Sequence, residues 1–256
     1  MLLFFLYYLT FWQITILTTC FLNYFMVYFS AVIKMTKIYI IRHCEAMGNV
    51  LRVFQGSSNF DVSELGKVQL KFLEERFDAI PLDRIYSSPL KRAMKTAEAV
   101  RGIKNIEIEP HDGLLELHGG VVEGKPFVEA FNSIEGLADA WDNHPEDFAP
   151  EGGEPMRHAY ERIWETVKQI AEENRGKAVA LSTHGGVTRC LMCRLLKNDI
   201  KELKNVPWSE NTAVSLIEFD DNGDVNVVFF NDHSHLPEEF VNRKSRIPSF
   251  MKGNNK

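Results

Sequence analysis

The chain has 256 residues, of which 45% are hydrophobic and 25% are charged, and its formal net charge is −6. This composition is typical of a globular protein with one large or two small domains. The negative net charge argues against nucleic acid as a partner, so any anion site must be a local cluster of positive charge. The four cysteines, at positions 20, 44, 190 and 193, are too few and too scattered to predict a disulfide framework.

The first 33 residues contain no Asp, Glu, Lys, Arg or His, and Lys34 and Lys37 follow them. About 20 apolar residues are enough to cross a bilayer as a helix. One interpretation is a membrane anchor, whose flanking lysines would keep the catalytic domain cytoplasmic. The other is a start-site extension, because Met35 stands where an α/β domain would naturally begin. A cleaved signal peptide fits poorly, since no positively charged region precedes the apolar stretch. We therefore divide the chain into an apolar segment 1–34 and a domain 35–256.

From Met35 onward, short apolar runs alternate with amphipathic stretches. The runs predict strands over 37–41, 84–88, 105–109 and 177–183. Helices are expected over 63–77 with Ser63 as N-cap, from Pro89 in the first turn to about residue 100, over 154–174, and from about Gly185. Residues 213–219 and 225–230 predict a terminal hairpin. This order predicts an α/β fold, with a mainly parallel central sheet and helices on both faces.

Polar side chains follow each predicted parallel strand. Arg42 and His43 come directly after the first strand, and Arg92 lies one turn into the helix after the second. Glu116 follows the third strand, and His184 follows the fourth. In such sheets ligands bind beyond the carboxyl ends of the strands, so these side chains are expected to meet. Two histidines in such places, beside arginine or glycine, indicate more than structural roles.

Separated motifs around these residues occur in one order: RHCEAMGN (42–49), FQG (54–56), DVSELG (61–66), YSSPLKRAMKTAE (86–98), LLELHGGVVEG (114–124), PEGGE (150–154) and STHGGVTR (182–189). Together they resemble the histidine phosphatase superfamily, in its phosphatase branch, over about residues 36–220. The resemblance implies a phosphoglycerate mutase-like three-layer sandwich. It also implies a small phosphorylated substrate. Because the predicted pocket is cationic, we expect no metal requirement, and we expect no other cofactor.

The resemblance assigns roles to individual residues. His43 would attack phosphorus and form a phosphohistidine, and Glu116 would be the general acid and base. The phosphate oxygens would be bound by a cationic and polar pocket, composed of Arg42, Asn49, Gln55, Gly56, Arg92, His184 and Gly185. The chemistry agrees, because guanidinium groups bind phosphate oxygens in pairs and a helix N-terminus favours anions.

Two other functions would use the same residues differently. Metal-dependent hydrolysis would use His43, His184 and Glu116, with Asp61 or His118. Two arginines beside both histidines would repel a divalent cation, and no HxxxH pair is present. A non-catalytic, membrane-tethered binding module is the other rival, although every chemical group is retained here. The sequence leaves a homodimer open.

Some positions depart from the family pattern. Cys44 stands where glycine is usual, and we favour a space-filling role over a thiol whose pKa is lowered by its cationic neighbours. Val122 and the pair Pro155–Met156 also differ, and both changes are expected to affect the leaving-group side of the pocket. The pair Cys190 and Cys193 lies in a predicted helix, which favours core-facing side chains over a redox or metal site.

Phosphatase and mutase chemistry share this machinery. The stretch between Glu116 and His184 is short and already holds segment 126–143 and a long helix, so we expect little chain to be left for a lid. It has no lysine or arginine between Phe127 and Glu154, and the carboxylate of a phosphoglycerate would need such a partner. The sequence therefore favours a phosphomonoester hydrolase, with phosphoglycerate mutase-type phosphoryl transfer as the alternative.

Overall fold

The computed structural model describes residues 35–241. The predicted apolar segment 1–34, with its anchor or extension, lies outside the described residues. Within 35–241 no helix combines the length and the hydropathy needed to cross a membrane.

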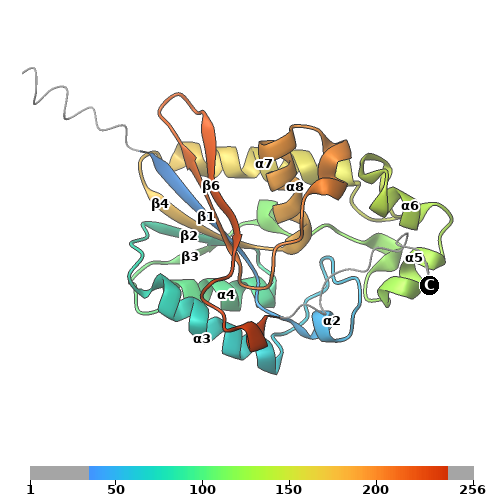
Figure 1. Cartoon of the computed structure of the whole chain (residues 1–256), viewed down its shortest axis with the longest axis horizontal. Coiled ribbons are helices and arrows are strands. Elements are labelled where there is room, and N and C mark those ends of the chain that lie inside the picture. Colours follow the sequence, from blue (N-terminus) through green and yellow to red (C-terminus); the bar gives the residue numbers. More distant parts are fainter. Residues whose placement is uncertain (1–34, 242–256) are drawn as a thin grey trace, which may run out of the picture. The chain divides into compact units, whose positions relative to one another are not determined.

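Six strands form one sheet in the order β3-β2-β4-β1-β5-β6 (Figure 1). They are β1 Thr36–Arg42, β2 Arg84–Ser87, β3 Ile108–Pro110, β4 Ala178–Thr183, β5 Val214–Phe219 and β6 Val225–Asp232. Strands β1 to β4 pair in parallel, and β5 and β6 add an antiparallel hairpin beside β1. The predicted α/β fold with a mainly parallel sheet is confirmed, and the hairpin makes the sheet mixed.

Helices cover both faces of the sheet (Figure 1). Helices α3 (Glu64–Asp78) and α4 (Lys91–Arg101) lie on one face, and α7 (Met156–Glu173) and α8 (Gly185–Lys197) lie on the other. Each face has its own hydrophobic core, because side chains alternate across β1: Ile38 and Ile40 pack toward α7 and α8, whereas Ile41 packs toward α3 and α4. Burying both faces of a parallel sheet in this way fixes its strand ends in space.

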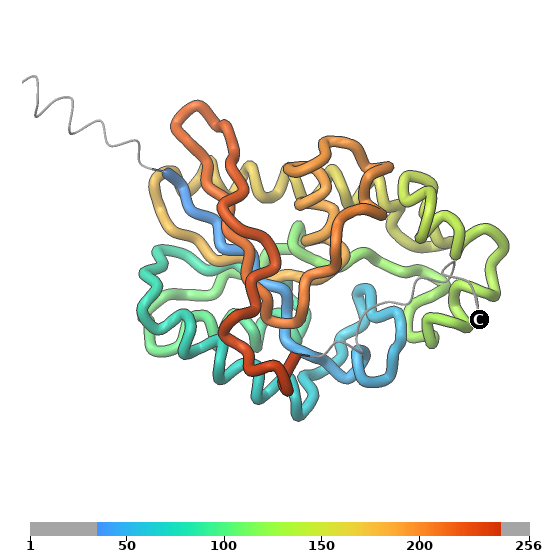
Figure 2. The backbone as a smooth tube through the Cα atoms, viewed as in Figure 1, coloured from blue at the N-terminus to red at the C-terminus, as the bar shows by residue number. Residues whose placement is uncertain are grey.

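Three short helices lie beyond the carboxyl ends of the parallel strands. They are α2 (Met47–Val50), α5 (Phe127–Asn132) and α6 (Leu137–Asp142). Figure 2 shows the chain after β1 running beside the chain that leads into α5, and a backbone bond from Phe54 N to Lys125 O (3.0 Å) joins them. Short 3₁₀ segments lie at Asp112–Leu114, Gly120–Val122, Pro145–Asp147, Ile200–Asn205 and Glu238–Phe240.

The predicted helix and strand ends are largely confirmed, with two corrections. Ser63 caps α3, since its side chain accepts a hydrogen bond from Gly66 N at 3.0 Å. Pro89 does not lie in the first turn of α4; the helix begins at Lys91 after an extended N-cap, Leu90. Strand β3 begins at Ile108 instead of residue 105, because Ile106 N is bonded to Lys104 O in a turn.

Candidate active site

The register of the sheet brings the two predicted histidines together. Strands β1 and β4 are neighbours, with Arg42 opposite Thr183, and His43 N donates to Thr183 O at 2.9 Å. His43 and His184 therefore leave the sheet side by side, and their ring centroids are 5.1 Å apart. Sequence reasoning placed each of them at a strand end, and the parallel pairing explains their proximity.

His43 is held in one orientation and in its neutral form. Its ring Nδ1 lies 2.6 Å from Cys44 O, and because a carbonyl only accepts, Nδ1 carries the proton. The Asn211 amide donates to the His43 carbonyl at 2.9 Å. Burial, followed by the charges of Arg92 and Arg42, lowers the pKa of His43 well below its ordinary value. The lone pair on Nε2 is therefore available as a nucleophile near neutral pH.

Two buried arginines flank His43. Arg42 donates through Nη1 to Ser209 O, and Arg92 donates to Ser58 O (2.7 Å) and Gly56 O (2.8 Å). Burial lowers the pKa of Arg92 to about 10, so its guanidinium is still charged at neutral pH. The Nε atoms of Arg42 and Arg92 are buried and have no hydrogen-bond partner within residues 35–241. Buried polar atoms normally have partners, and an anionic ligand would supply acceptors for both.

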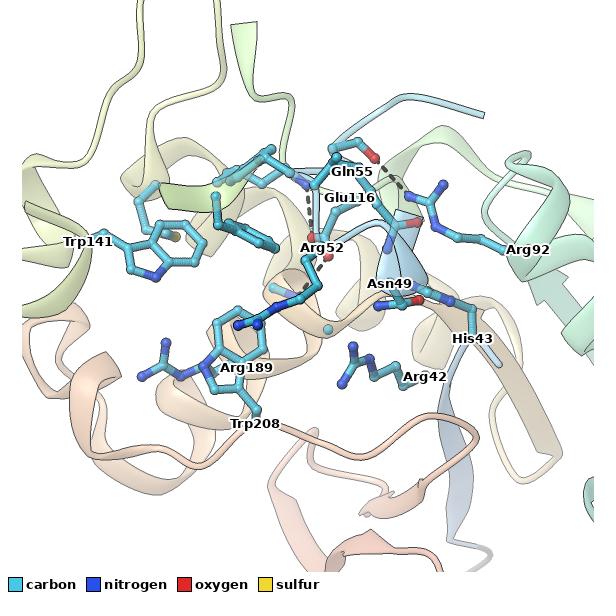
Figure 3. A pocket seen from close by; sticks show the side chains of 18 of the residues that line it. Arg42, His43, Asn49, Arg52, Gln55, Arg92, Glu116, Trp141, Arg189 and Trp208 are labelled. Carbon is cyan, nitrogen blue, oxygen red and sulfur yellow. Dashed lines mark hydrogen bonds between the residues drawn. The ribbon is translucent and has the colours of Figure 1, made fainter. Parts of the chain in front are cut away.

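The remaining predicted phosphate ligands surround the same space (Figure 3). Asn49 Oδ1 accepts from Ala46 N at 2.9 Å, which fixes the side-chain amide beside His43. Gln55 Oε1 is buried and unpartnered among the described residues. Gly185 begins α8, and a Cβ there would lie 3.1 Å from Arg42 Nε, so glycine lets the guanidinium approach the helix N-terminus.

His184 is brought close to the site without lining it. Its side chain is fully buried, its Nε2 lies 2.7 Å from Ser88 Oγ, and its Nδ1 has no partner in the described part of the chain. Burial, Arg92 and His43 lower its pKa well below the ordinary value. The other eight predicted residues line one pocket, namely Arg42, His43, Asn49, Gln55, Gly56, Arg92, Glu116 and Gly185.

The carboxylate of Glu116 is bound by backbone N–H groups. Oε2 accepts from Gly186 N at 2.9 Å, and Oε1 accepts from Leu117 N at 2.9 Å and Val187 N at 3.2 Å. Two of these donors belong to the first turn of α8, where a negative charge is stabilised. A Cβ on Gly186 would lie 2.7 Å from Glu116 Oε1, so this close approach requires glycine.

A second charged pair, which the sequence analysis missed, supports the backbone before Glu116. Arg162 donates to Gly113 O (2.8 Å) and Leu115 O (3.0 Å). It also forms two bonds with the carboxylate of Glu154, at 2.8 and 2.7 Å. Glu154 is the last residue of the PEGGE motif, so this motif acts on the Glu116 backbone through Arg162.

Two residues of the rival metal site, Asp61 and His118, are not brought to the pocket of His43 and Glu116. Asp61 forms an exposed ion pair with Lys95 at 2.6 Å, and His118 is half exposed and 3.9 Å from Glu123. Neither residue lines the pocket that contains His43 and Glu116.

The outer part of the pocket was not predicted. Besides the predicted residues, its lining includes Arg52 and Arg189 and an apolar group made of Phe127, Trp141, Met156, Leu203 and Trp208. Segment 126–143 takes part in the site, because α5 and α6 carry Phe127 and Trp141 to the pocket lining. No lysine or arginine lies between residues 127 and 154, but Arg52 and Arg189, from two other segments, bring positive charge to the pocket. The spacing of Arg189, four residues after Gly185 on one helix, could have indicated its place.

The unusual positions have structural explanations. Burial raises the pKa of the Cys44 thiol to about 12, so the cationic neighbours do not activate it and the space-filling role is favoured. Cys190 and Cys193 are free and buried in the core, as expected. Val122 is buried away from the pocket, so its expected role beside the leaving group is wrong, whereas Met156 does line the pocket.

Comparisons with known proteins agree with this geometry. A family model described as the histidine phosphatase superfamily (branch 1) matches residues 38–233. The chain is 29% identical over 190 residues to phosphoserine phosphatase 1 of Hydrogenobacter thermophilus, which covers 73% of this chain and 88% of that protein. It is 28% identical over 188 residues to phosphoglycerate mutase-like protein 4 of Arabidopsis thaliana, covering 72% and 80%. The solved structure of Bacillus stearothermophilus YhfR matches with a TM-score of 0.74 and 33% identity, over 78% of this chain and 98% of that one.

Proposed function

The chain belongs to the histidine phosphatase superfamily, and from its site we propose that it hydrolyses the phosphomonoester of a small metabolite through a phosphohistidine on His43. The observation that carries this proposal is the state of His43. It is neutral, its Nδ1 proton is bound to Cys44 O, and it lies between two buried guanidinium groups. A fixed neutral imidazole among cations is suited to attack a phosphate dianion.

In the first step Nε2 of His43 attacks phosphorus, and the bond from phosphorus to the ester oxygen breaks. Glu116 gives its proton to the leaving oxygen, so an alcohol departs. Arg42 and Arg92 donate to the equatorial oxygens of the phosphoryl group, where negative charge is spread in the transition state. The N–H groups at the start of α8 favour the same charge.

In the second step a water molecule attacks the phosphohistidine. Glu116 takes a proton from this water, the phosphorus–nitrogen bond breaks, and inorganic phosphate and neutral His43 are released. Glu116 is then protonated again for the next cycle. Acid–base assistance of this kind typically contributes ~10²–10⁴-fold to the rate.

Hydrolysis is favoured over mutase-type transfer by the relative with phosphatase in its name, which matches 73% of this chain. The two reactions differ only in the acceptor of the phosphoryl group, which is water or a second substrate. The fate of a labelled phosphoryl group therefore separates them: a hydrolase releases inorganic phosphate, and a mutase returns the label to an organic acceptor.

The test of the proposed function is the pair of variants His43→Ala and His144→Ala, assayed with phenyl phosphate in the presence of EDTA. His43→Ala should lose turnover and the acid-labile phosphoprotein together; mass spectrometry after a rapid quench in alkaline denaturant would detect the phosphoprotein. His144 is exposed and outside the pocket, so its variant is the matched control. Turnover by His43→Ala at the wild-type rate would contradict the assignment of His43 as the nucleophile. Activity that EDTA abolishes and one divalent ion restores would favour the metal mechanism.

We further propose that the domain acts on the cytoplasmic side of a membrane. The support is the uncharged stretch 1–33 followed by Lys34 and Lys37. Mass spectrometry of the native N-terminus, together with membrane fractionation, tests this. A native protein that begins at Met35 and stays in the supernatant would contradict it.

A further inference from the structure

The peptide group between Cys44 and Glu45 is hydrogen-bonded at both of its ends. Its carbonyl oxygen, Cys44 O, accepts the Nδ1 proton of His43 at 2.6 Å. Its N–H, which belongs to Glu45, donates to Oε1 of Gln69 at 2.8 Å. One planar amide therefore connects the ring of the proposed nucleophile to a side chain of α3.

The side-chain amide of Gln69 is held with its oxygen toward this peptide. Its Nε2 donates to Phe240 O at 2.9 Å, and because a carbonyl only accepts, this bond fixes which end of the amide is the nitrogen. Phe240 ends the last 3₁₀ segment, and its ring packs on Phe72 of α3 with the ring centroids 5.6 Å apart. Gln69 is fully buried, so water does not compete for these bonds. The segment that follows β6 thus orients Gln69.

The first turns of α3 are packed directly against the same loop. Ser63 N donates to Glu45 O at 3.1 Å, and Ser63 Oγ donates to Oε1 of Glu45 at 2.5 Å. A Cβ on Gly66 would collide with Glu45 O, so the helix backbone approaches as closely as glycine allows. Gln69 follows Gly66 by three residues and lies on the same face of the helix. The helix backbone therefore sets the distance from Gln69 to the loop.

A chain of hydrogen bonds through one amide has an effect on its far end. Each bond in such a chain polarises the next, and the effect is largest where water is excluded. The bond from Glu45 N to Gln69 increases the negative charge on Cys44 O, which makes that oxygen a better acceptor for the Nδ1 proton of His43. The partner of one ring nitrogen sets the tautomer of a histidine and the basicity of its other nitrogen.

We infer that Gln69 is a positioning residue for the reaction and acts on His43 through the peptide between Cys44 and Glu45. It holds the carbonyl of that peptide against Nδ1 and strengthens the bond, so that the lone pair on Nε2 stays directed at phosphorus. Gln69 is absent from the lining of the pocket, so it contacts neither substrate nor reacting atoms. The inference rests on the proposed function, because it concerns the reactivity of the same nucleophile.

Two variants of Gln69 test the inference by single-turnover formation of phosphohistidine from phenyl phosphate. Gln69→Leu removes the acceptor, whereas Gln69→Glu keeps an accepting oxygen in either protonation state. Outer partners of a metal-bound histidine typically contribute about 10–100-fold, and we expect Gln69→Leu to react at least about tenfold more slowly. Gln69→Glu should keep most of the wild-type rate. Inhibition by inorganic phosphate should be unchanged in both variants, because the pocket lining is intact.

The Nδ1 proton of His43 gives a measurement that does not need turnover. Its NMR signal, observed in protein that carries isotope-labelled histidine, moves upfield when its hydrogen bond weakens. The signal should move upfield in Gln69→Leu and remain downfield in Gln69→Glu. If the wild-type protein forms no phosphohistidine, the proposed function has failed, whereas the shift of this signal still tests the link to Gln69.

Thr96 provides the matched control. Like Gln69 it is fully buried, and its Oγ1 accepts from Cys44 N at 3.0 Å. It therefore supports the same loop, but through the preceding peptide, whose carbonyl belongs to His43 itself and does not bind the ring. Thr96→Val should lower the free energy of unfolding as Gln69→Leu does, while the Nδ1 signal stays in place and phosphohistidine formation slows much less.

Two results would overturn the inference. One is an Nδ1 signal that does not move in Gln69→Leu, and the other is an equal loss of rate in Gln69→Leu and Thr96→Val, which would assign Gln69 a structural role alone. If Gln69→Leu does not fold, Gln69→Asn takes its place. Its side chain is shorter by one carbon, so the acceptor is withdrawn while the polar group is kept, and the same upfield shift and slower reaction are expected.

Discussion

His43 and Glu116, the two side chains with assigned chemistry, are held by different kinds of contact. The ring of His43 is fixed by the carbonyl of the next residue, and the carboxylate of Glu116 is fixed by backbone N–H groups. In both cases the partner is main chain, which the surrounding elements keep in place. Reacting groups that are held rigidly in this way need little rearrangement on the path to the transition state.

The acid role of Glu116 predicts a dependence on the leaving group. An alkyl phosphate leaves as a basic alkoxide that needs a proton, whereas nitrophenyl phosphate leaves as a weakly basic phenolate. Glu116→Gln should therefore lose ~10²–10⁴-fold in phosphohistidine formation from an alkyl phosphate and much less from nitrophenyl phosphate. Single-turnover measurement of the phosphoenzyme makes the comparison, because hydrolysis of the intermediate should slow with both esters.

The ratio of the losses with the two esters serves as the control for this experiment. The amide that replaces the carboxylate places an N–H against one of the backbone donors, and this disturbance affects both esters alike. Equal losses with the two esters would assign Glu116 to binding instead of acid catalysis.

At the scale of elements, the N-terminus of α8 connects the two halves of the reaction. Its first residue, Gly185, borders Arg42 and the phosphate site, and its second, Gly186, binds the Glu116 carboxylate. One helix turn thereby sets the position of the general acid relative to the phosphoryl group. Both functions depend on the absence of a side chain at these positions.

Gly186→Ala should impair the reaction without weakening the helix. The added Cβ would lie 2.7 Å from Glu116 Oε1 and displace the carboxylate. Alanine is a better helix former than glycine by up to ~1 kcal/mol, and this gain offsets the cost of displacing the carboxylate, so the free energy of unfolding should stay close to the wild-type value. We expect at least a tenfold lower rate of phosphohistidine formation from an alkyl phosphate.

A double variant tests whether Gly186 acts through Glu116. If it does, adding Gly186→Ala to Glu116→Gln should cost much less than it costs alone, because both changes affect one step. Fully additive losses would show that the glycine has a separate role.

At the scale of the whole molecule, two buried histidines and one half-buried histidine connect stability to pH. His43, His184 and His235 all have a pKa lowered mainly by burial, in the case of His235 to about 4 with a further contribution from Arg76. An unfolded chain exposes these rings and protonates them near pH 6.5. Below that pH the unfolded state binds more protons than the folded one, so stability is lost as the pH falls.

His235→Gln should make stability less sensitive to acid. Between pH 6 and 5 the wild-type His235 is protonated almost only in the unfolded chain, which costs up to about 1.4 kcal/mol per pH unit. The fall in unfolding free energy over this interval, measured by urea titration, should be smaller in the variant by roughly 1 kcal/mol. The exposed His144→Gln is the control and should keep the wild-type dependence. An unchanged dependence in His235→Gln would mean that its ring is not the group that titrates.

Local patterns in the sequence determined most of the fold and the inner half of the site. Apolar runs of strand length, helical periodicity and the Ser63 cap act over a few residues, so they can be recognised without knowing the fold. The meeting of Arg42, His43, Arg92 and Glu116 followed from one general property of parallel sheets, namely that strand ends lie at one edge. The resemblance to a family then supplied the roles.

The tertiary structure alone decided the rest, because it depends on contacts between distant segments. Arg52 and Trp208 come from two segments far from Gly185 in the sequence, and no spacing shows that they line the same pocket. The raised pKa of Cys44 was also decided by burial, which outweighs the charges that the sequence places nearby. Val122 faces the core because the direction of a side chain in a short 3₁₀ turn is set by what packs around it. The chemistry of the inner site could therefore be predicted from local sequence patterns, whereas the lining of the outer site depends on how the elements pack.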